Sequence, residues 1–206
     1  MQIFTFGDPA SKRILIQPVD DHDLAVIESE VAAIRKTAPD FCLLAVRVGD
    51  WNADLSPWKA PPVFGTEGFS GGAAAFLQEI LKLCSDPAKT YCIGGYSLAG
   101  LFALWAAYRT DVFCGVAAAS PSLWFPGFSD YMKTHAIRTR RVYLSLGDRE
   151  ERTRNPVMAT VGAKIREAHA LLKAAGTDCV LEWNPGNHFK DPDLRTAKAF
   201  SRILNR

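Results

Sequence analysis

A serine with very small neighbours lies in the run Gly94-Gly95-Tyr96-Ser97-Leu98-Ala99-Gly100, between a strand-like and a helix-like apolar segment. A serine on such a turn can act as a nucleophile, and the residues two before and two after it must be small because strand and helix nearly touch there. Gly95 and Ala99 meet this condition, although alanine stands where the G-x-S-x-G pattern has glycine. An ordinary glycine-rich turn with a capping serine is the alternative. The position after a buried strand favours a nucleophile.

A serine hydroxyl becomes a good nucleophile only when a neighbouring base takes its proton. His188 follows the apolar segment Cys179–Trp183 on an irregular loop, Asn184-Pro185-Gly186-Asn187-His188. When the catalytic residues follow one another along the chain as serine, acid and histidine, the histidine follows the last strand, as His188 does. The other histidines fit less well and are expected to be ordinary surface or packed residues: His22, His135 and His169.

An acid that orients the histidine should end the preceding strand, and Gly147-Asp148-Arg149-Glu150-Glu151 offers three carboxylates there. A G-x-x-[DE] arrangement selects Glu150, whereas Asp148 directly follows Gly147 and can cap the turn through its own backbone. We predict Glu150 as the acid, with Asp148 as the next candidate. Two alternatives remain open for the acid: Glu151 could take this role, or a serine–histidine dyad could work without an acid. A third alternative is that all three carboxylates belong to a solvated loop face and pair with nearby arginines.

The oxyanion of an acyl-transfer intermediate needs backbone donors. The Leu98 N–H lies at a helix start beside Ser97 and is the first candidate. The second should come from Pro18-Val19-Asp20, where Pro18 has no N–H, so we predict Val19 or Asp20. Trp124 and Trp51 are candidate substrate-binding residues, although aromatic side chains in loops more often serve packing.

Alternating apolar and amphipathic segments must position these residues. Apolar strands separated by helices imply a mostly parallel sheet with helices on both faces, an α/β fold. Residues 1–206 contain no repeat or linker, which predicts one domain. The predicted strands are Ile3–Phe6, Arg13–Gln17, Phe41–Val48, Thr90–Gly94, Phe113–Ala119, Arg141–Leu146 and Cys179–Trp183. The predicted helices carry Leu24 to Ile34, Gly72–Cys84, Leu98–Tyr108, a segment from about Pro156 to Gly176, and Leu194 to Leu204.

Composition limits the partners. A formal net charge of +2 gives no reason to expect nucleic acid or an anionic membrane surface as a partner. No apolar run approaches the ~20 residues of a membrane span, and no leader-like segment opens the sequence, so a cytoplasmic location is expected. The five cysteines are odd in number and form no CxxC pair, which favours free thiols. No metal or cofactor is expected, because the cysteines and histidines show no ligand-like spacing.

Four stretches resemble the esterase branch of the α/β-hydrolases, which includes enterochelin-type siderophore esterases, feruloyl esterases and S-formylglutathione hydrolases. They are Gly95–Leu104, Ala119-Ser120-Pro121-Ser122-Leu123-Trp124, Tyr143–Asp148 and Gly186-Asn187-His188-Phe189. The resemblance implies an α/β-hydrolase fold in a minimal form without a lid domain. It also implies a nucleophile and a base at the positions of Ser97 and His188.

The sequence therefore predicts a serine hydrolase that cleaves a small-molecule carboxylic ester, in one version a siderophore-type ester, through an acyl-enzyme. Two alternatives stay open within enzymes: thioester hydrolysis, and acyl transfer to an acceptor other than water. From a different class, a non-catalytic binding protein could have kept the fold, because fold does not determine function.

Overall fold

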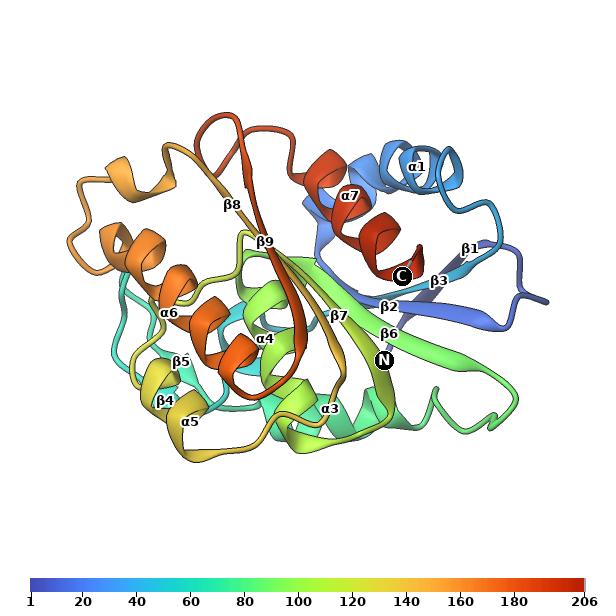
Figure 1. Cartoon of the computed structure of the whole chain (residues 1–206), viewed down its shortest axis with the longest axis horizontal. Coiled ribbons are helices and arrows are strands. Elements are labelled where there is room, and N and C mark those ends of the chain that lie inside the picture. Colours follow the sequence, from blue (N-terminus) through green and yellow to red (C-terminus); the bar gives the residue numbers. More distant parts are fainter. Residues whose placement is uncertain (206) are drawn as a thin grey trace.

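Seven strands form one sheet in the order β1-β3-β2-β6-β7-β8-β9 (Figure 1). The structure is a computed structural model and describes residues 1–205. Only β1 runs antiparallel to its neighbour, while every other adjacent pair is parallel. The strands are β1 Ile3–Gly7, β2 Arg13–Val19, β3 Cys42–Arg47, β6 Thr90–Tyr96, β7 Phe113–Ala119, β8 Arg141–Gly147 and β9 Asp178–Asn184.

Helices cover both faces of this sheet. On one face α1 (Asp21–Arg35) packs against α7 (Pro192–Leu204), and α7 lies over β6, β7 and β8. On the other face α4 (Ser97–Arg109) packs on β6 and β7, and α6 (Val161–Ala174) packs on β8 and β9 (Figure 1). The remaining elements are α2 Trp51–Asp54, β4 Lys59–Ala60, β5 Phe69–Ser70, α3 Ala73–Leu81, α5 Phe128–Thr134, and the 3₁₀ turns η1 Glu150–Arg152 and η2 Met158–Thr160.

The sequence pattern explains the sheet. Strands β2, β6, β7 and β8 are buried almost throughout, as continuous apolar runs in a sheet covered on both faces should be. Two apolar cores result, one under α3, α4 and α6 and one under α1 and α7. The predicted α/β class with a mostly parallel sheet is therefore confirmed. All seven predicted strands are present, β7 with the predicted ends and the other six with shifted ends.

Several predicted boundaries need correction. The helix expected from about Pro156 begins at Val161, because residues 158–160 form the 3₁₀ turn η2. The short hairpin of β4 and β5, within residues 59–70, is absent from the predicted elements. So is α5, the one helix that the described residues place between β7 and β8.

Parallel strands bring their carboxyl ends to one edge of the sheet, and the loops that leave this edge carry the candidate catalytic residues. Ser97 follows β6, Glu150 follows β8 and His188 follows β9. In such sheets ligands bind at this edge. The strand order thus gathers residues that are far apart in the chain.

Candidate active site

Ser97 is the first residue of α4 and has a left-handed backbone conformation, with φ of 56°. A non-glycine residue there is strained by roughly 1–3 kcal/mol, so the surrounding packing must hold it. The packing is tight: a Cβ added to Gly95 would lie 2.7 Å from the Cβ of Ala99. A Cβ on Gly100 would lie 3.0 Å from the Gly95 carbonyl oxygen. The small residues around Ser97 are therefore required by the close approach of β6 and α4.

His188 lies between Ser97 and Glu150. Its Nε2 is 3.0 Å from the Ser97 Oγ, and its Nδ1 is 2.7 Å from a Glu150 carboxylate oxygen, Oε2. The hydroxyl of Tyr96 donates to the backbone oxygen of His188 over 2.7 Å, which fixes the loop that carries the imidazole. The structure thus brings together Ser97, His188 and Glu150, the three residues that the sequence predicts in this order along the chain.

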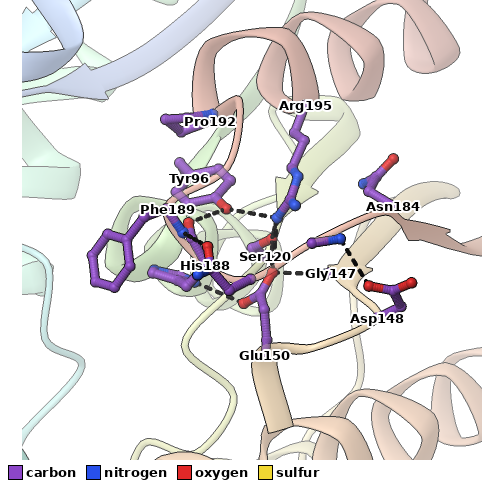
Figure 2. A network of polar contacts seen from close by, with 12 residues as sticks. Tyr96, Ser120, Gly147, Asp148, Glu150, Asn184, His188, Phe189, Pro192 and Arg195 are labelled. Carbon is purple, nitrogen blue, oxygen red and sulfur yellow. Dashed lines mark hydrogen bonds and ion pairs between the residues drawn. The ribbon is translucent and has the colours of Figure 1, made fainter. Parts of the chain in front are cut away.

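The second carboxylate oxygen of Glu150, Oε1, has its own set of donors. It accepts hydrogen bonds from the Gly147 N–H at 2.7 Å, from the Ser120 hydroxyl at 2.7 Å and from the Arg195 guanidinium at 3.0 Å (Figure 2). Glu150 is only 7% exposed. Burial raises the pKa of this carboxyl, but the hydrogen bond and charge of His188, with the donors Ser120 and Gly147, hold that pKa below its ordinary value. Glu150 is therefore a buried carboxylate that stays ionised.

Arg195 ties the histidine loop to this carboxylate. The side chain is buried between α7 and the sheet edge, 4% exposed. It donates to the Tyr96 hydroxyl at 3.0 Å (Figure 2). Through its other terminal nitrogen it donates to the Pro185 carbonyl oxygen at 3.0 Å. A buried arginine needs a charge partner and filled donors, and Glu150 with these oxygens supplies both.

The other two carboxylates of the loop lie elsewhere. Asp148 accepts the Gly186 N–H at 2.7 Å, which braces the β8 loop against the histidine loop (Figure 2). Glu151 pairs with Arg166 at 3.3 Å. Within residues 1–205 neither carboxylate bonds to His188, so the structure does not bring Asp148 to the position of the acid.

The predicted oxyanion donors differ in their placement. Leu98 belongs to the first turn of α4, where backbone N–H groups have no helical partner. Val19 lies in the ladder with β3, and its carbonyl oxygen accepts the Val48 N–H. Because both backbone groups of a strand residue point to the same side, the Val19 N–H faces β3 and not β6. The Asp20 N–H donates to the Asp23 carboxylate in a capping box. The structure therefore gives Val19 no place beside Ser97.

The two candidate tryptophans line different pockets. Trp124 is 7% exposed and lines a pocket of about 220 Å³ together with Ser120, Glu150 and His188. Trp51 begins α2 and lines a separate, open pocket beside Arg47 and Gly49. Only Trp124 thus shares a pocket with the histidine.

Four site residues carried no role in the sequence prediction: Tyr96, Ser120, Ser122 and Arg195. Ser122 has its Oγ 3.2 Å from that of Ser97, and its N–H donates to the Ser97 carbonyl oxygen. Ser120 and Ser122 stood in the stretch that carried the resemblance, directly after a strand, which is a usable signal. No sequence signal could have identified Arg195, because a single arginine in an amphipathic helix looks like part of the exposed face of that helix.

All five cysteines are free thiols. In the described part of the chain no group of three or more His, Cys, Asp or Glu side chains could hold a metal ion. Over the same residues, no helix combines the length and apolar character needed to cross a membrane.

At the level of sequence, this chain resembles known proteins only distantly. No family model matches the chain. An uncharacterized protein of Bacillus subtilis (strain 168), YbbA, is 22% identical over 162 residues, which are 71% of this chain and 64% of YbbA. The chain therefore matches less than two thirds of that relative.

Solved structures give a stronger likeness. The siderophore hydrolase EstA from Aspergillus nidulans has a TM-score of 0.66 at 20% identity, over 97% of this chain and 85% of EstA. An IroE-like serine hydrolase from Shewanella oneidensis has a TM-score of 0.70 at 15% identity, over 95% of this chain and 71% of that one. A Bacillus cereus carboxylesterase has a TM-score of 0.63 at 15% identity, over 99% and 94%. This chain has the α/β-hydrolase fold that these esterases share.

Proposed function

We propose that the chain is a serine hydrolase that cleaves a carboxylic ester through an acyl-enzyme. The observation that carries this proposal is the continuous chain of contacts from Ser97 through His188 to Glu150, at 3.0 Å and 2.7 Å. A serine, an imidazole and a buried carboxylate in this geometry are the parts of a catalytic triad. The fold shared with esterases supports the same reaction class.

The proposed mechanism gives each group a step. With its Nδ1–H donating to Glu150, the imidazole has an unprotonated Nε2 that accepts the Ser97 proton as Oγ attacks the ester carbonyl. The Leu98 N–H is the donor available to the oxyanion. His188 then gives the proton to the leaving alkoxide, and the acyl group remains on Ser97. A water molecule, deprotonated by His188, attacks the acyl-enzyme. As the bond between the acyl carbon and the Ser97 Oγ breaks, His188 returns the proton to that oxygen, which releases the carboxylic acid and restores the Ser97 hydroxyl.

Glu150 supports these steps by charge. An imidazolium forms each time His188 takes a proton, and the adjacent carboxylate stabilises it. The lowered pKa of Glu150 keeps the carboxylate ionised at neutral pH, so it does not take the proton itself. Arg195 offsets part of that negative charge, so the acid is stable in its buried site before the substrate arrives.

Substitution of the nucleophile tests the proposal. We expect Ser97→Ala to fold normally and to lose hydrolysis of p-nitrophenyl butyrate by roughly 10³-fold or more, because the variant lacks the hydroxyl that is hydrogen-bonded to His188 Nε2. A fluorophosphonate probe should label the parent chain and not this variant. Ser85→Ala is the matched control, since Ser85 is exposed and precedes β6, at the end opposite Ser97. Parent-level activity in folded Ser97→Ala would overturn the mechanism, and a parent chain that is neither labelled nor active would favour a binding protein.

A further inference from the structure

The pocket of about 220 Å³ beside His188 has walls of two kinds. One part is apolar and is formed by Trp124, Met158, Val161 and Phe189. Phe189 is 85% exposed, and its ring stands edge-on to the His188 imidazole with ring centroids 5.6 Å apart. An exposed aromatic ring at the mouth of a pocket provides apolar surface for a ligand to cover.

The other part of the pocket wall is cationic. Arg149 and Arg152 line it, both exposed, and neither guanidinium has a carboxylate or hydrogen-bond partner among residues 1–205. The neighbouring acids are already paired: Glu150 with His188 and Arg195, and Glu151 with Arg166. The pocket therefore has an uncompensated positive charge next to an apolar wall.

From these observations we infer that the pocket binds the leaving-alcohol part of the ester, and that this part is a single-ring aromatic or similar apolar group carrying a carboxylate. This inference rests on the proposed function and names its substrate class. Two guanidiniums suit a carboxylate, which each can bind in a planar fork. Trp124, Met158 and Phe189 suit the apolar body of the same group.

The position of His188 selects the alcohol over the acyl group. His188 lines this pocket and Ser97 does not. In the acyl-transfer step the imidazole protonates the leaving oxygen, so the group attached to that oxygen lies on the side of the imidazole. The volume is below the roughly 300–1,000 Å³ of sites for drug-sized ligands, which suits one ring and excludes a large alcohol.

A pair of nearly isosteric substrates tests the charge preference: 3-carboxyphenyl butyrate and the neutral 3-carbamoylphenyl butyrate. At low salt we expect kcat/KM to favour the carboxylate by roughly tenfold, about threefold from each exposed arginine. Arg149→Gln and Arg152→Gln should each lower the preference about threefold, and the double variant should abolish it. These variants should lower hydrolysis of the carboxylate ester more than that of the neutral ester, and added salt should weaken the preference of the parent chain.

Arg154→Gln is the matched control, because Arg154 is an exposed arginine in the same segment that does not line the pocket. This variant should keep the full preference. An equal rate for both substrates in the parent chain, or a preference that survives the double variant, would overturn the inference while leaving the ester hydrolase intact.

Binding separates this inference from the proposed function. In Ser97→Ala, which cannot form an acyl-enzyme, titration calorimetry should show 3-hydroxybenzoate binding more tightly than 3-hydroxybenzamide. The double arginine variant in that background should bind both alike. This result would support the pocket assignment even if the parent chain hydrolysed neither ester, whereas equal binding in Ser97→Ala would refute it.

Discussion

Glu150 stays ionised although it is buried, because each of its carboxylate oxygens has a hydrogen-bond donor. Oε2 faces the imidazole, and Oε1 receives Gly147, Ser120 and Arg195. Hydrogen bonds to a charged group contribute more than neutral ones, and losing a partner leaves a buried charge uncompensated. These donors hold the carboxylate in place and keep it ionised. In the proposed mechanism both properties are needed to orient the imidazole and to stabilise its charged form.

Amide substitutions distinguish Glu150 from Asp148. Glu150→Gln should lower kcat by roughly 10²–10⁴-fold, because an amide can hold the wrong imidazole tautomer and cannot stabilise the imidazolium. Asp148→Asn should keep most activity, since its amide oxygen can still accept the Gly186 N–H. Steady-state kinetics on p-nitrophenyl butyrate, with thermal melts to confirm folding, measure the difference. A greater loss in Asp148→Asn would move the acid to Asp148, and small losses in both would favour a dyad.

At the residue scale, the sequence could propose a site residue where local backbone chemistry selects it. The turn around Ser97 demands small neighbours, and the loop of His188 contains Pro185 and Gly186, so both positions were readable. Arg195, Tyr96 and Ser120 contact Glu150 or one another only in the folded chain, across separations of 30 residues or more. Val19 was assigned from its position after a strand, and only the pairing of β2 with β3 shows which way its N–H points.

At the scale of elements, β6 and α4 approach more closely than ordinary side chains allow. Gly95 faces Ala99 of α4, where an added Cβ would lie 2.7 Å from the Ala99 Cβ. On the other side of the strand, Gly94 faces Ala117 of β7 and Phe200 of α7. The close approach of β6 and α4 holds Ser97 in its left-handed conformation, so the packing of these two elements supports the strain at Ser97.

A double-mutant cycle at this contact tests that explanation. Gly95→Ala should lower the free energy of unfolding by about 1–3 kcal/mol, because the added methyl meets the Ala99 Cβ. Ala99→Gly should cost about 1 kcal/mol through helix propensity. The double variant should be more stable than the sum of the two losses predicts, since removing the Ala99 methyl relieves the clash. Urea denaturation measures all three. Simple additivity would show that the two methyls do not meet.

Helices and strands could be predicted from the sequence where the pattern of buried apolar residues alone determines them. The strands of the sheet are apolar runs, and α1 shows a clear helical period, so both could be identified without tertiary information. The short elements α5, β4 and β5 depend on contacts between distant segments. The Trp58 indole N–H, for example, donates to the Pro126 carbonyl oxygen at 2.9 Å, and its ring stacks on Phe128. No local periodicity encodes such contacts.

At the scale of the whole molecule, the core under α1 contains a buried acid that catalysis does not use. Glu30 of α1 is 3% exposed and accepts a hydrogen bond from the Gln17 side chain of β2 at 3.2 Å. Its other carboxylate oxygen has no hydrogen-bond partner in the described part of the chain. Burial raises the pKa of Glu30 well above its ordinary value, and the charges of Asp23 and Asp193 add to that rise against the bond from Gln17.

A raised carboxyl pKa in the folded state makes stability depend on pH in a definite direction. Below the pKa of the unfolded chain Glu30 is protonated in both states, and its contribution to stability is complete. As pH rises through the folded pKa, the unfolded chain ionises freely while the folded chain must bury a charge, so stability is lost. Asp23, whose pKa burial raises to about 6, acts in the same direction. The core between β2 and α1 therefore loses stability as pH rises above the range in which free carboxyl groups titrate.

Removing the charge of Glu30 should relieve this loss. We expect Glu30→Gln to melt at a higher temperature than the parent chain at pH 8, because the glutamine oxygen can still accept the Gln17 N–H and no charge is buried. At pH 4 to 5 the two should differ little, since Glu30 is protonated there in the parent.

Glu28→Gln is the matched control: it removes the same charge from the exposed face of α1 and should have a small effect at both pH values. Melting temperatures by circular dichroism across pH 4 to 8 provide the measurement. If Glu30→Gln were destabilised at pH 8 more than at pH 4, the carboxylate would be stabilising the folded chain, and the burial argument would be wrong.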